Sequence, residues 1–555
     1  MRSAALVTLL VFGVFAARSV AAQGSVTVRA DDPMYLDADR LIDAGLVDTV
    51  IVGQRPYSRM RLALIARQVQ RRMADMVTSH EHVSIQAVHA EARLLRALAS
   101  ELSIAGDVSV PAGSTAAGMQ WLHSLRVEAL VTDAPTRAVP PNGLGSSEAD
   151  LNTLTDYHQG LRLVPGGNVA VESGHSVLLP FGLTVQARPR LWIHDERGGA
   201  VGVARGATLE LPSASARLVK GNVALTVGRE YTVWQQAEGA AQFFSENAPA
   251  LDMIRLASDA PFALPSPLHW LGPIAGTIQI ADLGASVKNS HSRLVAYKLS
   301  ASPVRGLELG ARYENHFGGS GSPPARAADR IIDLVPFLDV FRHHVDSTDI
   351  ESDKLLGLDA RLRLRNAGNV TLFGEFSLED FDLHRLRSIF TEDAAYSTGM
   401  IIPQLVVPSL SARLLYHSLG LRFYQHHLLT NGIASHRLLL GDELGRDAQG
   451  YAMLVRWQGV GNLSLSGDMA YEERRNDEYL GAYTNPGRQG LVFTRASTQP
   501  RERRTRGVGG VRWLSTDGHV VIEARGGMER TTNFDFRVGM PSTHGVGSIA
   551  ATFFP

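Results

Sequence analysis

The stretch that decides the fold is Leu356-Gly357-Leu358-Asp359-Ala360-Arg361-Leu362-Arg363-Leu364-Arg365. Its even positions are apolar, and its odd positions are Gly, Asp or Arg. Because successive side chains of a strand point to opposite faces, this segment has one apolar face and one charged face. The same alternation recurs between Gly118 and the C-terminus, for example in residues 307–314, 463–471 and 520–529.

A two-faced strand fits either a soluble β-sandwich or a membrane barrel, and one strand cannot separate the two. Three features together favour the barrel: an export signal, about 440 residues of strand pattern, and strands of about ten residues, which cross a bilayer when tilted. About eighteen such segments lie between Gln120 and Phe554. We therefore predict a mainly β protein, with a transmembrane antiparallel β-barrel of about 18 strands at residues 118–555.

The connections between these strands fall into two groups. In outer-membrane barrels, short periplasmic turns alternate with long external loops. The connection at residues 231–273 is long but falls on the side of the short turns, so either a strand pair is missed there or the segment folds into the lumen. The tight connections are Asp195–Ala200, Ser302–Gly306, Asn366–Asn369, Gln458–Gly461 and Thr516–Gly518, and the long ones are Thr132–Ser176, Phe317–Asp353, Asp380–Tyr396 and Glu472–Arg501.

The N-terminal region has a different pattern. Arg2 is followed by an apolar or small run over residues 3–17 and by small residues up to Ala22, which is typical of a signal peptide at residues 1–22. The alternative is a membrane anchor, but the run is shorter than the roughly 20 residues of a spanning helix. Apolar residues then recur at helical spacing from Met34 to Leu102. We predict a small periplasmic α-helical domain at residues 23–117, ending in a linker at 105–118.

Composition excludes several classes of protein. The 555 residues carry a net charge of -1, without the basic excess of a nucleic-acid binder, and contain no Cys, which excludes disulfides, thiolate metal sites and cysteine nucleophiles. Only four of the 54 basic residues are Lys. This excess of Arg reflects either a genomic coding bias or a lumen that holds acidic sugars, since guanidinium groups match carboxylates in bidentate geometry.

The charged strand faces predict a braced lumen. Their arginines and carboxylates are expected to form cross-strand ion pairs, which suits a plugged barrel better than an open pore. These side chains are Arg312, Arg361, Arg363, Arg365 and Arg525, with Glu308, Glu314, Asp359, Glu523 and Glu529.

Several motifs resemble the capsule assembly protein Wzi family. They are Asp32-Pro33-Met34-Tyr35, Leu41 to Leu46, Arg55 to Arg59, Val227-Gly228-Arg229 with Trp234, Ser245 to Pro249, and Leu439 to Gly445. The resemblance implies an outer-membrane barrel of about eighteen strands with a periplasmic helical bundle, no enzymatic activity, and lectin-like binding of capsular polysaccharide. One departure is Gln235 to Gly239, where the family usually has glycines.

Aromatic and planar polar side chains, which commonly bind sugars, gather in two connections. Packing of a plug or of the membrane interface is the favoured explanation of the aromatic residues, and glycan binding is the alternative. The first candidate glycan site comprises Arg229, Tyr231, Trp234, Asn247, His269 and Trp270, and the second, in a long loop, comprises Arg474, Arg475, Tyr479 and Tyr483.

The sequence offers little catalytic chemistry. It has no Gly-x-Ser-x-Gly turn, and the histidine pairs His343-His344 and His426-His427 lack further ligands at metal spacing. We predict no enzymatic activity, cofactor or metal, and a monomer in outer-membrane lipid that binds capsular or exopolysaccharide and no nucleic acid. Contact with the polysaccharide export machinery is a further expectation. A porin for small solutes and a barrel hydrolase remain the alternatives.

Overall fold

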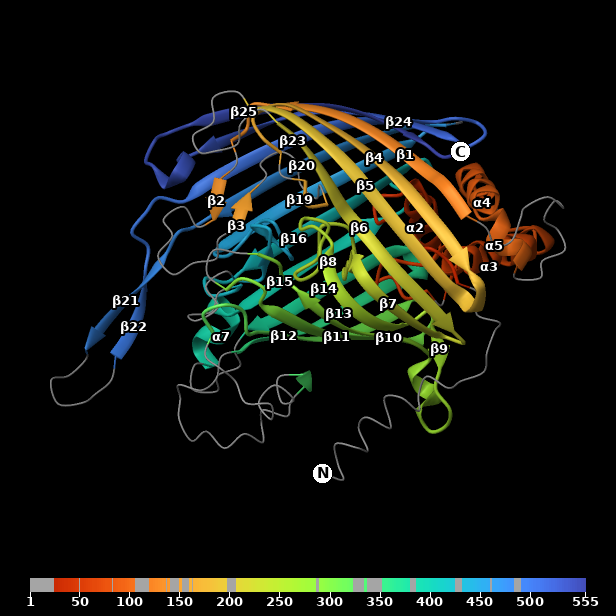
Figure 1. The fold of residues 1–555 in the computed structure, drawn as a ribbon, viewed down its shortest axis with the longest axis horizontal. Coiled ribbons are helices and arrows are strands. Elements are labelled where there is room, and N and C mark those ends of the chain that lie inside the picture. Colours follow the sequence, from red (N-terminus) through yellow and green to blue (C-terminus); the bar gives the residue numbers. More distant parts are fainter. Residues whose placement is uncertain are drawn as a thin grey trace.

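A computed structural model describes most of the chain, with one large antiparallel sheet and a group of helices at one end of it (Figure 1). The described residues are 24–48, 50–81, 83–104, 119–135, 137–139, 149–151, 159–161, 163–196, 206–285, 289–322, 334–336, 352–379, 386–424, 432–459, 462–483 and 491–555.

The sheet closes into a barrel of eighteen strands, as predicted. Each barrel strand pairs with the next one along the chain, and β1 closes the ring by pairing with both β4 and β25. The short β9 (Phe262–Ala263) continues the line of β8 along β10. The eighteen strands are β1 (Met119–Thr132), β4 (Gly166–Leu179), β5 (Leu183–Glu196), β6 (Gly206–Lys220), β7 (Val223–Glu230), β8 (Leu251–Ser258), β10 (Pro273–Asp282), β11 (Arg293–Val304), β12 (Leu307–Phe317), β13 (Ser352–Leu364), β14 (Val370–Glu379), β15 (Ala394–Ile402), β16 (Leu410–Leu419), β19 (Ala448–Gln458), β20 (Leu463–Arg474), β23 (Glu502–Leu514), β24 (Val520–Thr532) and β25 (Ser542–Phe553).

Alternation along the strands separates an outer apolar face from an inner polar one. On β13, Leu358 is 54% exposed on the outside, whereas Asp359 and Arg361 are buried inside. Residues 356–365 therefore behave as their pattern predicts. Side chains alternate along a barrel strand, and on β13 the odd-numbered ones face the lumen.

The two ends of the barrel differ. At the end near the helices and the C-terminus, which we call the turn end, most connections are short, as between β11 and β12 and between β23 and β24. The opposite loop end has the long connections, with the hairpins β2 (Arg137–Val139) with β3 (Ala149–Leu151) and β21 (Glu478–Tyr483) with β22 (Leu491–Ala496), the helix α7 (Leu386–Glu392), and the pair β17 (Ala434–Ser435) with β18 (Leu438–Leu439). Two predicted connections were wrong. The long connection after β1 ends earlier than predicted, because β4 begins at Gly166 and not after Ser176. The connection that starts at Asp195 was predicted as a tight turn but lies at the loop end.

The N-terminal helices pack around their own apolar core, which includes Leu41, Leu62 and Leu94. Asp32 and Ser58 cap two of the helices by accepting hydrogen bonds from backbone N–H groups. No helix in the described ranges is both long and apolar enough to cross a membrane. The helices are α2 (Pro33–Asp43), α3 (Arg59–Thr78), α4 (Ile85–Ala97) and α5 (Ala99–Ile104).

The N-terminal segment is also attached to the inside of the barrel. Glu308 of β12 accepts hydrogen bonds from the backbone N–H groups of Val52 and Gly53, at 2.7 and 2.9 Å. Residues 24–48 and 50–58 thus close part of the lumen at the turn end.

Of the two explanations offered for the connection at residues 231–273, the second is confirmed, because its first part, residues 231–250, folds into the lumen. The first was wrong in number: the connection contains one missed barrel strand, β8, continued by the short β9, and not a pair. There Phe243 packs against Phe423 and Tyr424 of the β16–β19 connection. The two segments together fill the lumen toward the loop end.

Candidate functional site

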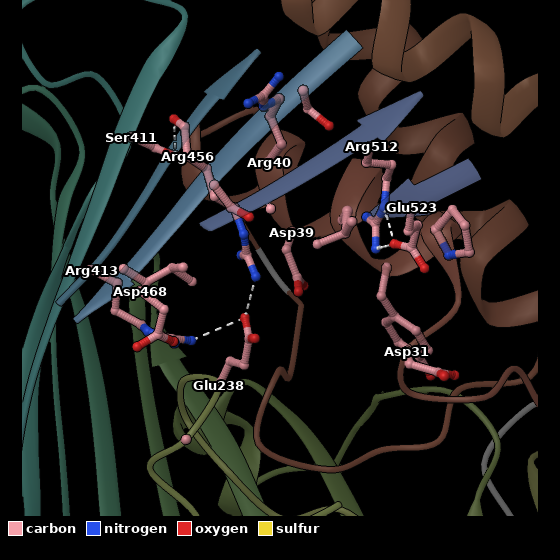
Figure 2. Close-up of a pocket in the computed structure, with 18 of the residues that line it drawn as sticks. Asp31, Asp39, Arg40, Glu238, Ser411, Arg413, Arg456, Asp468, Arg512 and Glu523 are labelled. Carbon is pink, nitrogen blue, oxygen red and sulfur yellow. Dashed lines mark hydrogen bonds and ion pairs between the residues drawn. The ribbon is translucent and has the colours of Figure 1, made fainter. Parts of the chain in front are cut away.

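A cavity of about 510 Å³ lies in the lumen, between the N-terminal segment and the wall formed by β16, β19, β20, β23 and β24 (Figure 2). It extends from the turn end, where Gln404, Gln458 and Asn462 line it, inward to His417 and Glu443. This volume falls within the roughly 300–1,000 Å³ of typical small-molecule sites.

The wall of the cavity is charged because the inward positions of its strands are charged. Arg413 of β16, Arg456 of β19 and Asp468 of β20 all face the lumen, while their neighbours Leu414 and Met469 are exposed on the outside. Tyr35 and Trp457 are the Phe, Tyr or Trp side chains among the described lining residues. The cavity is therefore suited to polar and charged ligands more than to apolar ones.

Glu238, in the segment 231–250, points from the opposite side toward the wall (Figure 2). Its Oε2 lies 2.6 Å from Arg456 Nη2 and 3.1 Å from Arg413 Nη1. Burial alone would raise the pKa of the Glu238 carboxyl, but attraction to these two guanidinium groups outweighs it and holds the pKa well below its usual value. Because 49% of the Glu238 side chain is open to the cavity, water screens this attraction.

Two further arginines face the cavity without a strong partner. Among the described residues, the side chain of Arg525 on β24 makes no hydrogen bond or ion pair, and Nη1 of Arg40 on α2 is buried without a hydrogen-bond partner. Burial lowers the pKa of Arg40 to about 10, so it remains charged at neutral pH.

Other charged groups brace the cavity. Asp39 pairs with Arg55 within the N-terminal segment, and Glu523 of β24 pairs with both Arg512 and Arg126. The Glu523–Arg512 pair joins the neighbouring strands β24 and β23, as predicted for the lumen, and the Glu523–Arg126 pair reaches across β25 to β1.

The prediction that the Arg361, Arg363 and Arg365 side chains pair across strands was wrong in its partners. Arg361 pairs with Asp43, and Arg363 and Arg365 pair with Asp48, all at 2.5–2.7 Å. Both carboxylates belong to the N-terminal segment. They reach these arginines because α2 and the residues after it lie directly over the inner face of β13.

The structure does not bring the first predicted glycan site together. Tyr231, Trp234 and Asn247 are buried in the fold, where Trp234 packs edge-on against Phe244 and Asn247 donates to the carbonyl oxygen of Leu439. Arg229 pairs with Asp252 on the outward positions of β7 and β8. His269 and Trp270 are exposed on the short helix η3 (Leu268–Leu271) at the turn end.

The second predicted site lies at the loop end. Arg474 is buried at the end of β20, and Arg475 is half-buried beside Glu473. The side chains of Tyr479 and Tyr483 lie outside the described part of the structure, as do His343-His344 and His426-His427. None of the predicted glycan-binding residues lines the described cavity, and their ligand role stays a prediction.

Sequence reasoning missed Glu238, Arg413 and Arg456. It placed Arg525 in the lumen, as found, but wrongly expected it in a cross-strand ion pair, which it does not make with any described residue. One signal pointed to Glu238, because Gln235 to Gly239 departs from the glycines usual in the resembling family. Among the described residues, no group of three or more His, Asp or Glu side chains could hold a metal ion.

Comparison with known proteins gives one strong likeness. The family model described as capsule assembly protein Wzi matches residues 123–543. The solved structure of Wzi from Escherichia coli, an outer-membrane carbohydrate-binding β-barrel involved in group 1 capsule assembly, has a TM-score of 0.62 at 16% identity, covering 95% of this chain and 99% of that one. No curated protein sequence matches the chain.

Other solved barrels are more distant. OccD3 of Pseudomonas aeruginosa has a TM-score of 0.40 at 11% identity, covering 79% of this chain and 93% of that one. OccAB1 of Acinetobacter baumannii has a TM-score of 0.41 at 10% identity, covering 78% and 94%. Neither likeness supports an argument about function.

Proposed function

The chain belongs to the capsule assembly protein Wzi family, and we propose on that basis that it is an outer-membrane, lectin-like barrel that binds capsular or exopolysaccharide and helps to assemble or retain it on the cell surface. The turn end with its helices faces the periplasm, and the loop end faces the exterior. Binding rather than catalysis is the activity proposed.

The observation that carries this proposal is the filled lumen with a charged cavity inside it. Arginine forks and carboxylates offer directional donors and acceptors to the hydroxyl and carboxylate groups of a glycan. The likeness to a carbohydrate-binding barrel in capsule assembly supports the same conclusion.

The attachments inside the barrel disfavour a porin. Glu308 holds the backbone of Val52 and Gly53 and also accepts a hydrogen bond from Gln236 of the segment 231–250. Both plugging segments are therefore tied to the same buried carboxylate, and a permeable pore would require these bonds to break.

Two finer points belong to the proposal. We propose a monomer, and closure of the barrel supports this only in that it leaves no edge strand open for pairing with a second copy. The helices and η3, which lie at the periplasmic end, offer the surface for contact with the export machinery.

The discriminating experiment is a deletion strain in which cell-attached and released polysaccharide are both measured. The proposal expects less glycan on the cells and more in the medium, and full restoration by the wild-type gene. Unchanged cell-attached glycan would refute it. Recording from the purified protein in planar bilayers tests the porin alternative, for which steady, large conductance is expected.

A further inference from the structure

Four arginines converge on one part of the cavity, and we call them the arginine cluster: Arg40, Arg413, Arg456 and Arg525. They come from α2, β16, β19 and β24, so the closed barrel and its plug are both needed to assemble them. Two carboxylates, Glu238 and Asp468, lie among them. The cluster thus has more cations than anions, since the nearby Asp39 is already paired with Arg55.

Glu238 enters this cluster on a firmly held backbone. Before Glu238 in the chain, the backbone N–H of Gln236 donates to the Glu375 carboxylate at 2.8 Å. Ala237 before it and Ala240 after it are both buried in an apolar cluster with Phe373 and Leu415. The Glu238 side chain itself is half open to the cavity and has Arg413 and Arg456 as its ion-pair partners. The side chain can therefore rotate away without disturbing the segment that carries it.

The arginine cluster has the donors of a carboxylate-binding site, and the carboxylate of Glu238 already occupies it. A single Glu238 oxygen is the ion-pair partner of two different guanidinium groups, which leaves the planar, bidentate capacity of both arginines largely unused. Arg525 and the buried Nη1 of Arg40 add donors that Glu238 does not satisfy. A second carboxylate that is free to orient could engage more of these donors than Glu238 does.

We propose that the arginine cluster binds the carboxylate of an acidic, uronic-acid type sugar, and that Glu238 occupies this site until the sugar displaces it. The proposal rests on the glycan-binding function above and specifies its site and ligand class. Selectivity follows from charge: a neutral sugar cannot compensate the arginines and does not displace Glu238.

The test measures binding of a short oligogalacturonate to the purified full-length protein in detergent by calorimetry, with a neutral malto-oligosaccharide of equal length for comparison. Glu238→Gln removes the negative charge that competes with the sugar carboxylate. It is expected to tighten oligogalacturonate binding about tenfold, which corresponds to about 1.4 kcal/mol. Arg525→Gln, which breaks no hydrogen bond or ion pair with a described residue, is expected to weaken it by a similar factor. Binding should also weaken with added salt.

Asp252→Asn is the matched control, because it removes a carboxylate paired with Arg229 on the outward positions of the barrel wall. It should leave binding unchanged, and heat-modifiable migration on a gel verifies that each variant is folded. If the wild type binds glycan while Glu238→Gln and Arg525→Gln bind as the wild type does, the inference is refuted and the proposed function stands. If the wild type binds neither oligosaccharide and the deletion strain retains its glycan, both are refuted.

Discussion

Arg363 offers a sharp test of how the N-terminal segment is held in the lumen. Its Nη1 donates to the carbonyl oxygens of Ile42 and Val47, both at 2.9 Å, and its Nη2 pairs with Asp48. Hydrogen bonds to a charged group contribute about 1.5–3 kcal/mol each, so losing the two bonds from Arg363 should weaken this attachment by about 3–6 kcal/mol in Arg363→Ala. Water that hydrogen-bonds to the freed carbonyl oxygens reduces this free-energy loss. Even the lower value raises the opening of the segment more than a hundredfold.

Hydrogen–deuterium exchange of peptides spanning residues 42–53 measures this opening directly. Arg365→Ala is the control, because Arg365 pairs with the same Asp48 at 2.7 Å but is 43% exposed and should contribute at most about 1 kcal/mol. We expect much faster exchange in Arg363→Ala and nearly unchanged exchange in Arg365→Ala. Equal protection in both variants would show that the helices, rather than Arg363, hold the segment in place.

Three other perturbations have defined outcomes. Burial and neighbouring carboxylates raise the pKa of Glu246 to about 8, so its contribution to stability falls as the pH rises from about 4.3, the unfolded value, to about 8. Glu246→Gln should therefore become progressively more stable than the wild type from about pH 5 to about pH 8 and keep a constant advantage above that, and parallel pH profiles of the unfolding midpoint would contradict this. Gly228 has a φ of +121°, and an added Cβ would lie 2.4 Å from a backbone oxygen, so Gly228→Ala should cost more than about 1–3 kcal/mol and lower the temperature at which migration on a gel changes. Leu358→Arg places a charge on the outward face at the middle of β13 and should destabilise the barrel in lipid vesicles by about 2–4 kcal/mol, whereas an unchanged urea midpoint would argue that this face does not meet lipid.

Much of the barrel was predictable because its cause is local. Alternation over ten residues separates the two faces of a strand, and the pattern of turns and loops orders neighbouring strands, so the eighteen-strand ring follows from short-range signals. The broken alternation at residues 231–273 was itself informative, since it marked the segment that enters the lumen and carries Glu238.

The candidate site was less predictable because its parts are remote in the chain. Alternation shows that Arg361 and Arg363 face inward, but it cannot show that their partners are Asp43 and Asp48, more than 300 residues earlier. For the aromatic cluster around Trp234, composition allowed either plug packing or a sugar-binding surface, and only the structure shows the side chain packed against Phe244 inside the plug.

The sequence by itself determined the strand faces, the separation of helices from barrel and the charged character of the lumen, because these depend on periodicity and on the balance of Arg with Asp and Glu. Only the tertiary structure decided which charges meet. Ion pairs and hydrogen bonds act over a few ångströms, and the arginine cluster exists only where barrel closure and the inward fold of residues 231–250 bring α2, β16, β19 and β24 to one cavity.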